Sequence, residues 1–116
     1  MIARRLAQRF GAKIVERRGG MAPFRCVISE LETRGPTIVL YRDTLELLAQ
    51  LVVAQRLPFE PQSLDEIAIA HECFHLRWSR APEERAHEYA RALLQLPASP
   101  ALLESALRGY LRKLGS

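Results

Sequence analysis

The sequence predicts an α+β fold, with an N-terminal helix, a small three-stranded and largely antiparallel sheet, and then four helices. The period of the apolar residues is helical at the start of the chain, drops to two in the middle, and is helical again to the end. Capping residues and prolines divide this last part into four segments. With 116 residues, 48% of them apolar and 26% charged, the chain is expected to form a single domain over 1–116.

The first half of the chain predicts one helix and three strands. Apolar residues four apart over residues 2–10 indicate a short amphipathic helix that ends at Gly11. Residues 12–18 predict a brief strand, which a pair of glycines closes. Alternating residues over 24–31 and β-branched residues over 36–41 predict the two strands of an antiparallel hairpin.

The second half predicts helices throughout. Two pairs have capping-box spacing, with a capping side chain three residues before a glutamate: Asp43 with Glu46, and Ser63 with Glu66. Pro82 is expected at the first position of a third helix. The four predicted helices cover residues 44–57, 63–78, 82–96 and 99–114.

The helix predicted over residues 63–78 contains the motif HECFH, an instance of HExxH. Residues four apart on a helix are neighbours, so His71 and His75 can reach one zinc ion while Glu72 leans over it. Both histidines also fall on the apolar stripe of this helix. Two core histidines satisfied by hydrogen bonds are the simpler interpretation, but the glutamate directly after the first histidine favours a metal site.

A catalytic zinc ion takes three protein ligands and keeps one position open for water. The third ligand is expected on the next helix, where the apolar stripe extends backward through Glu83, whereas Glu84 lies on the polar face. An ordinary acidic residue near a helix N-terminus is the alternative for Glu83. His87 is either the third ligand or an outer residue that orients one, and we favour the outer position.

Peptide hydrolysis follows as a hypothesis. Zinc held by His71, His75 and Glu83 would polarise a carbonyl and acidify a water molecule, and Glu72 would serve as general base and then as general acid. The substrate is expected to add a strand at the sheet edge, along residues 36–41.

Three tyrosines, Tyr89, Tyr41 and Tyr110, are available candidates for stabilising an oxyanion, although a tyrosine in such a position is more often a half-buried core residue. Two cysteines cannot build a disulfide framework. Cys73 lies about 200° around its helix from His71, which predicts a buried structural thiol facing away from the metal. Cys26 could in principle reach the zinc.

Composition and charge narrow the other expectations. The net charge of +4 comes from scattered arginines, so no direct nucleic-acid binding is expected. No apolar run is long enough for a membrane span or a signal segment, and the thiols suit a reducing compartment, so the expected location is cytoplasmic. The apolar face of residues 99–114 more plausibly closes the core than forms an interface, which predicts a monomer or weak dimer.

HECFH followed by EERAHEYARALLQLP resembles ImmA/IrrE-type zinc metallopeptidases and the very small gluzincins over residues 64–97. This resemblance implies a zincin-like fold, a zinc-dependent hydrolase acting on a protein substrate, and Glu83 as the third ligand. It also implies a helix-turn-helix repressor as partner. The alternative is a zinc-bound regulatory or interaction module that acts on such a repressor with little or no general peptidase activity.

Overall fold

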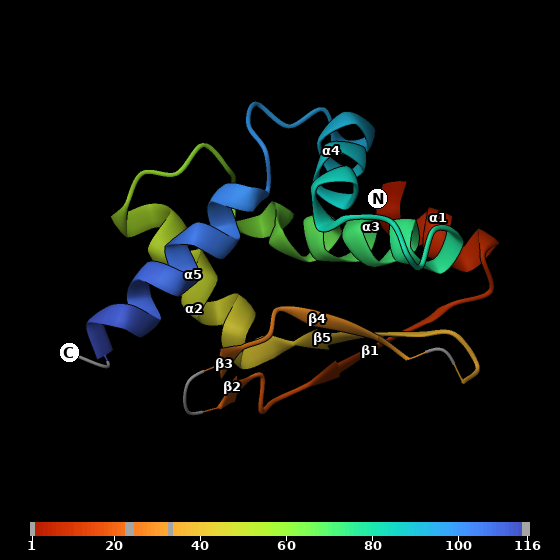
Figure 1. The fold of residues 1–116 in the computed structure, drawn as a ribbon, viewed down its shortest axis with the longest axis horizontal. Coiled ribbons are helices and arrows are strands. Elements are labelled where there is room, and N and C mark those ends of the chain that lie inside the picture. The colour runs from red at the N-terminus through yellow and green to blue at the C-terminus, as the bar shows by residue number, and fades with distance from the viewer. Residues whose placement is uncertain (1, 23–24, 33, 115–116) are drawn as a thin grey trace.

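The computed structural model describes residues 2–22, 25–32 and 34–114. These residues confirm the predicted α+β class, with one helix, a three-stranded sheet and four further helices (Figure 1). In chain order the elements are α1 (Ile2–Arg9), β1 (Lys13–Arg17), β2 (Met21–Ala22), β3 (Arg25–Cys26), β4 (Ser29–Glu32), β5 (Thr37–Tyr41), α2 (Arg42–Ala54), the 3₁₀ turn η1 (Pro61–Ser63), α3 (Leu64–Arg77), α4 (Glu83–Leu94) and α5 (Ala101–Leu114).

The sheet has the strand order β1, β5, β4, so β5 lies at its centre. β4 and β5 form an antiparallel hairpin with Ser29 opposite Leu40, which confirms the predicted hairpin. β1 pairs with β5 in parallel, with Lys13 opposite Thr37. The sheet is therefore mixed, with one antiparallel and one parallel pair.

The strand predicted over residues 24–31 is not continuous. β3 pairs with β2 in a separate two-stranded ribbon, and the sheet strand begins only at Ser29, while Phe24 lies outside the described residues. The N–H of Val27 donates to the carbonyl of Gly20 at 2.8 Å. The chain therefore ends its pairing with the β2 segment before its pairing with β5 begins. Alternation shows which residues share a face but not which strand they pair with, and for this reason the break was not predicted.

The central position of β5 corrects the expected substrate edge. Residues 36–41 contain β5, which is paired on both sides and has no open edge for another strand. β4 is an edge strand of the described sheet, and it packs beside α3. β1 is the other edge strand, so an added strand can pair with β1 or β4, and β4 is the edge that lies beside α3.

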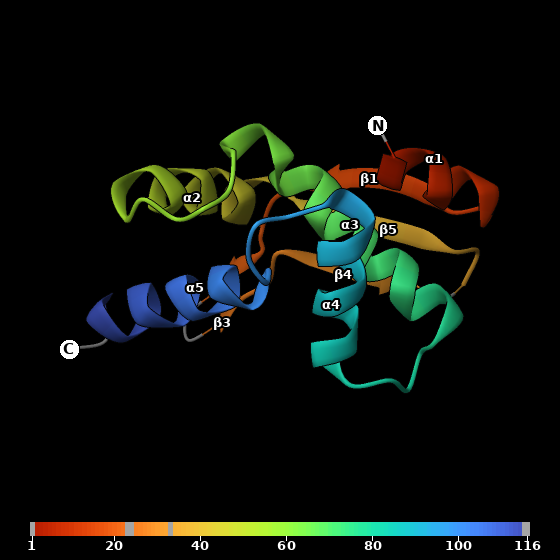
Figure 2. The same cartoon turned by 90° about the horizontal axis from the view of Figure 1, so that it is seen from above.

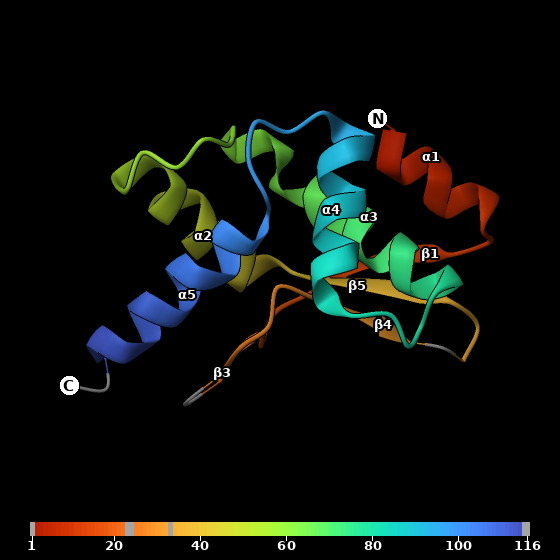
Figure 3. The same ribbon diagram turned by 45° about the horizontal axis from the view of Figure 1, so that its top comes forward.

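The helices gather on one face of the sheet, and α3 crosses that face (Figure 1). α1 lies along one side of α3 and α4 along the other, as the view from above shows (Figure 2). α2 and α5 lie together at the far end of the molecule (Figure 3). Ile38 and Leu40 of β5 and Ile69 and Cys73 of α3 are wholly buried in one core cluster. Burial of such side chains, worth about 1.5–3 kcal/mol for each large aliphatic one, fixes α3 in the core.

The helices differ in detail from the predicted boundaries, and the capping boxes do not form. α2 begins at Arg42 and α3 at Leu64, and neither start has a side-chain cap. Ser63 already has helical backbone angles, whereas a capping residue needs an extended conformation. Pro82 is the residue before α4 and not its first residue. Within the described ranges, no helix is both long enough and apolar enough to cross a bilayer.

Asp43 connects the turn after β1 to the start of α2. Its carboxylate accepts the N–H groups of Gly19 at 3.0 Å, Gly20 at 3.2 Å and Met21 at 3.4 Å. Gly19 has a φ of +102°, which favours glycine, and a Cβ on Gly20 would lie only 2.5 Å from Thr44 Oγ1. The two glycines therefore allow the close approach that brings the carboxylate to this turn.

Arg42 holds the first turn of α3 against the sheet and α2. Its guanidinium binds both carboxylate oxygens of Asp65, at 3.1 and 2.8 Å, and also pairs with Glu16 of β1. Arg4 of α1 approaches the same carboxylate at 3.7 Å. Partly exposed ion pairs of this kind contribute little stability, so their main effect is to orient α3.

Asp43→Ala is expected to destabilise the fold by about 1–2 kcal/mol, because a charged acceptor of backbone hydrogen bonds is lost. Partial burial would raise the pKa of Asp43, but its backbone hydrogen bonds outweigh this and hold the pKa below its ordinary value. The contribution of Asp43 is therefore complete above the unfolded pKa of about 3.9 and declines as the pH falls through the lower folded value. Urea unfolding of the wild type and of Asp43→Ala tests this. The difference between their free energies of unfolding should be smaller at pH 3 than at pH 7.

Glu46→Ala is the matched control, because Glu46 lies on the same helix and forms an exposed ion pair with Arg18. It should cost less than about 1 kcal/mol. Equal losses in the two variants, or a difference for Asp43→Ala that stays constant down to pH 3, would contradict this account.

Candidate metal centre

The HExxH residues lie on α3, and the helix directs both histidines toward one cavity. His71 and His75 are one turn apart, with ring centroids separated by 4.8 Å. Their side chains are 16% and 14% exposed, and both line the cavity. The spacing of the motif therefore places two imidazoles where they can share a ligand.

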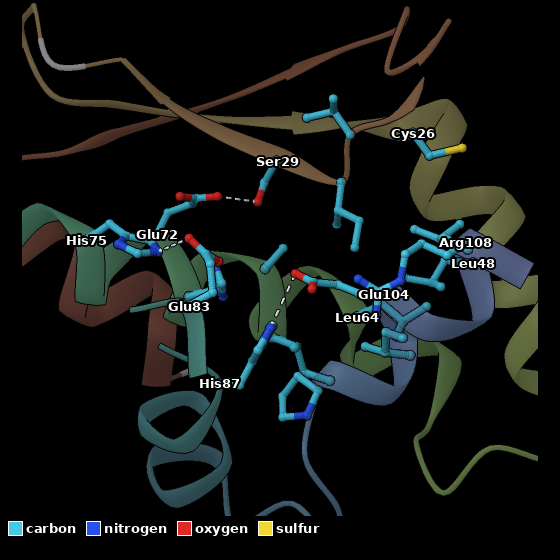
Figure 4. A pocket seen from close by; sticks show the side chains of 18 of the residues that line it. Cys26, Ser29, Leu48, Leu64, Glu72, His75, Glu83, His87, Glu104 and Arg108 are labelled. Carbon is cyan, nitrogen blue, oxygen red and sulfur yellow. Dashed lines mark hydrogen bonds and ion pairs between the residues drawn. The ribbon is translucent and has the colours of Figure 1, made fainter. Parts of the chain in front are cut away.

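Glu83 is the first residue of α4, and its carboxylate meets both imidazoles. Its Oε2 lies 2.8 Å from Nε2 of His71, and its Oε1 lies 3.0 Å from Nε2 of His75 (Figure 4). The expected burial of Glu83 is wrong, because its side chain is 61% exposed. Ala86 and Ala90 form the buried face of α4, and Glu83 lies just before this face, at the mouth of the cavity.

These residues fit a zinc ion. Nε2 of His75 is buried and has no partner with hydrogen-bond geometry among the described residues, although Glu83 is 3.0 Å away. A buried polar nitrogen without a hydrogen bond is costly, and coordination of its lone pair would compensate it. Two imidazole nitrogens and one carboxylate are a donor set that zinc takes in catalytic sites. The roles of these three residues as ligands remain a prediction.

A second set of three residues shares His71 and Glu83 with the first. The ligand atoms of His71, Glu83 and His87 all lie within 4.8 Å of one another. We favour His75 over His87, because the Glu83 carboxylate contacts Nε2 of His71 and of His75 directly. Nε2 of His87 instead lies 3.3 Å from Oε1 of Glu104 (Figure 4). This position of His87 suits the outer residue that the sequence predicts.

The pKa values of His71 and His87 are shifted in opposite directions. Burial lowers the pKa of His71 although the Glu83 carboxylate opposes it, so the imidazole is neutral near pH 7 and has a lone pair for a metal. The Glu104 carboxylate beside the imidazole raises the pKa of His87, and His87 in turn lowers the pKa of Glu104. The rings of the two histidines lie 5.0 Å apart. His71 thus favours metal binding, whereas His87 favours a charged pair with Glu104.

Glu72 lies beside the imidazoles and contacts the sheet. The residue is only 6% exposed, and Ser29 Oγ donates a hydrogen bond to its Oε2 at 2.5 Å (Figure 4). Burial raises the pKa of Glu72, and the hydrogen bond from Ser29 opposes this rise. Because Ser29 is the first residue of β4, the edge strand orients the carboxylate.

Ser29 and Glu104 are the site residues that sequence reasoning missed. A serine in an alternating strand resembles any residue on a solvent-facing side, and a glutamate in the first turn of a helix resembles an ordinary dipole carboxylate. Both residues reach the site only through contacts between distant elements: β4 packs beside α3, and Glu104 of α5 faces His87 of α4. No signal in the sequence itself distinguished them.

The tyrosines proposed as oxyanion candidates do not line the cavity. Tyr89 packs against Phe74 and Trp78, with ring centroids 5.5 and 6.2 Å away. Tyr41 is the last residue of β5, and Tyr110 lies in α5. The described residues around the cavity include none of the three, so the geometry favours their interpretation as packing residues.

The cysteines have different surroundings. Cys73 is fully buried, with Sγ 3.9 Å from the carbonyl of Ala3, and this confirms a structural thiol facing away from the histidines. Burial raises the pKa of Cys73 to about 11, so it stays protonated. Cys26 lines the cavity but lies at the opposite end from His75 (Figure 4), and burial, followed by the charge of Asp43, raises its pKa.

Comparison with protein-family models, with curated proteins and with solved structures finds no significant match.

Glu83→Ala is expected to weaken zinc binding by more than about 100-fold, because it removes a ligand and not merely an outer partner. The wild-type chain should hold about one zinc ion. Competition with a chromogenic chelator measures the affinity, and elemental analysis measures the stoichiometry. Glu84→Ala is the matched control, since Glu84 is exposed on the same helix, and it should bind zinc normally. Loss of zinc from Glu84→Ala alone would refute the assignment of Glu83.

His75→Ala and His87→Ala distinguish the two sets of ligands. His75→Ala should lose stoichiometric zinc, whereas His87→Ala should keep it with an affinity about 10- to 100-fold lower, as expected for an outer partner. The same competition assay measures both variants. The reverse result would make His71, Glu83 and His87 the ligands.

Proposed function

We propose that this chain is a zinc-dependent peptidase that hydrolyses peptide bonds in a protein or peptide substrate. The proposal depends on one observation: the imidazoles of His71 and His75 meet the Glu83 carboxylate, and the buried Glu72 lies beside them on the same cavity. The resemblance of residues 64–97 to ImmA/IrrE-type metallopeptidases supports the same function.

Each group has a defined chemical role in this proposal. Zinc bound by His71, His75 and Glu83 would act as a Lewis acid toward the peptide carbonyl and the attacking water. Glu72 accepts the proton of that water and then donates it to the leaving amine. Ser29 binds Oε2 of Glu72, so Oε1 is the oxygen that carries the proton.

The substrate is expected to bind in an extended conformation along β4. An added strand satisfies its backbone groups by pairing with the edge of the sheet. Ser29 belongs to β4 and contacts Glu72, so a strand paired there would carry its peptide bonds past the general base.

A purely structural zinc site fits the arrangement less well. Structural zinc ions usually have four protein ligands in a closed tetrahedral site. Here the three proposed ligands meet at the mouth of a cavity, and a second acidic residue beside Glu83, Glu72, lines the same cavity. A buried carboxylate that binds no metal has a use in hydrolysis but none in a structural site.

Glu72→Gln is expected to keep about one zinc ion per chain and to lose hydrolysis by at least about 100-fold, the usual scale for a lost general base. The amide keeps the size of the side chain but cannot accept the proton. Mass spectrometry of a mixed peptide library, with equal zinc loading, measures the loss.

Glu88→Gln is the isosteric control, because Glu88 is exposed on α4 and does not line the cavity. It should cleave like the wild type. A chelator should abolish cleavage and added zinc should restore it. Full activity of Glu72→Gln, or cleavage that survives the chelator, would rule out the proposed mechanism.

A further inference from the structure

The far end of the cavity at the metal centre is charged. The cavity has a volume of about 410 Å³, within the range of pockets that bind small ligands. His75, Glu72 and Glu83 lie toward one end of it, whereas Glu104 and Arg108 of α5 lie toward the other (Figure 4). Among the described residues that line the cavity, Arg108 is the one arginine or lysine. A substrate group that reaches the far end therefore meets a cation.

Arg108 is not paired with the neighbouring glutamate. Glu104 and Arg108 are four residues apart on α5, a spacing at which a glutamate followed by a basic residue often forms an ion pair. Here Oε1 of Glu104 instead lies 3.3 Å from Nε2 of His87. The guanidinium of Arg108 donates to the hydroxyl of Ser105 at 3.3 Å, and it forms no ion pair with a carboxylate of the described residues.

A guanidinium with free donors suits a carboxylate ligand. Its N–H groups form a planar fork that can bind both oxygens of a carboxylate in parallel. In Arg108, the contact with a neutral hydroxyl uses only part of this capacity. Arg108 is exposed, and an exposed arginine is commonly no more than a solvated charge. Its position on the wall of the cavity that leads to the metal centre favours a role in recognition.

The other charges around the cavity leave Arg108 without a counter-charge. The carboxylate of Glu104 is directed at the imidazole of His87. At the opposite end, a bound zinc ion would balance the charges of Glu72 and Glu83. An anionic group placed beside Arg108 is therefore stabilised, whereas a basic group there is repelled.

We propose that Arg108 binds a carboxylate of the substrate, a few residues from the bond that is cleaved. The inference rests on the proposed function, because the metal centre sets the position of the cut. The rings of His71 and His87 lie 5.0 Å apart, and Glu104 lies 3.3 Å beyond Nε2 of His87. Arg108 follows one helical turn later. At about 3.3 Å for each extended residue, Arg108 reaches a group within about four residues of the cut.

The carboxylate can belong to an acidic side chain or to the C-terminus of a peptide, and peptide binding distinguishes these sources without catalysis. Zinc-loaded Glu72→Gln is titrated with three octapeptides of glycine and serine that carry one varied residue. The first contains glutamate and is capped at both ends, the second contains glutamine and is capped, and the third contains glutamine and has a free C-terminal carboxylate.

At least one of the two acidic peptides should bind at least about tenfold more tightly than the capped glutamine peptide, the scale of one charge-assisted contact. The peptide that has this advantage identifies the source of the carboxylate. Cleavage of the three peptides by the wild type should follow the same order.

Arg108→Gln removes the charge, and Arg112→Gln is the matched control. Arg112 lies on the same helix, is exposed and does not line the cavity. Both variants lower the net charge equally, so a general attraction between an acidic peptide and a basic chain affects them alike. Arg108→Gln should abolish the advantage of the acidic peptide and leave binding of the capped glutamine peptide unchanged, whereas Arg112→Gln should keep the advantage. If Arg108→Gln does not fold, Arg108→Met, which also lacks the charge, is used with the same expectation.

The outcomes separate the two proposals. Zinc also binds carboxylates, so an advantage that survives the loss of the Arg108 charge belongs to the metal and overturns recognition by Arg108. Equal losses in the variants of Arg108 and Arg112, or equal or undetectable binding of all three peptides, also overturn it. An acidic preference in binding that depends on Arg108, without any cleavage by the wild type, supports recognition and contradicts the peptidase. Cleavage that ignores the carboxylate supports the peptidase and overturns recognition.

Discussion

The packing of α4 against α3 is the contact on which the candidate site depends. The two imidazoles belong to one helix and keep their spacing wherever α3 lies, but the carboxylate of Glu83 comes from another helix. Ala86 and Ala90 are fully buried on α4, and such small side chains allow two helices to approach closely. This approach places the first residue of α4 within 3.0 Å of both histidines.

Burial of α3 also prepares the groups electrostatically. The same loss of water lowers the pKa of His71 and raises that of Glu72. A neutral imidazole binds metal, and a carboxylate with a raised pKa is a better base near neutral pH. One physical cause therefore gives two neighbouring residues the protonation properties that their proposed roles require.

Local patterns were enough to predict the order of the elements and the shared face of His71 and His75. Helical spacing depends on residues a few positions apart, so the sequence carries it directly. Partners distant in the chain were harder to predict. The central place of β5, the hydrogen bond of Ser29 to Glu72 and the pairing of Glu104 with His87 all depend on which elements pack together. Likewise, Asp43 has the sequence position of a cap but binds a distant glycine turn instead.

The most direct test of the centre is a crystal structure of the zinc-loaded chain, with anomalous data collected at the zinc edge. One peak is expected at about 2.0–2.2 Å from Nε2 of His71, Nε2 of His75 and a carboxylate oxygen of Glu83. A peak coordinated by His87 or Glu104 without His75, or a chain that gives no peak near α3 after zinc loading, would contradict the account.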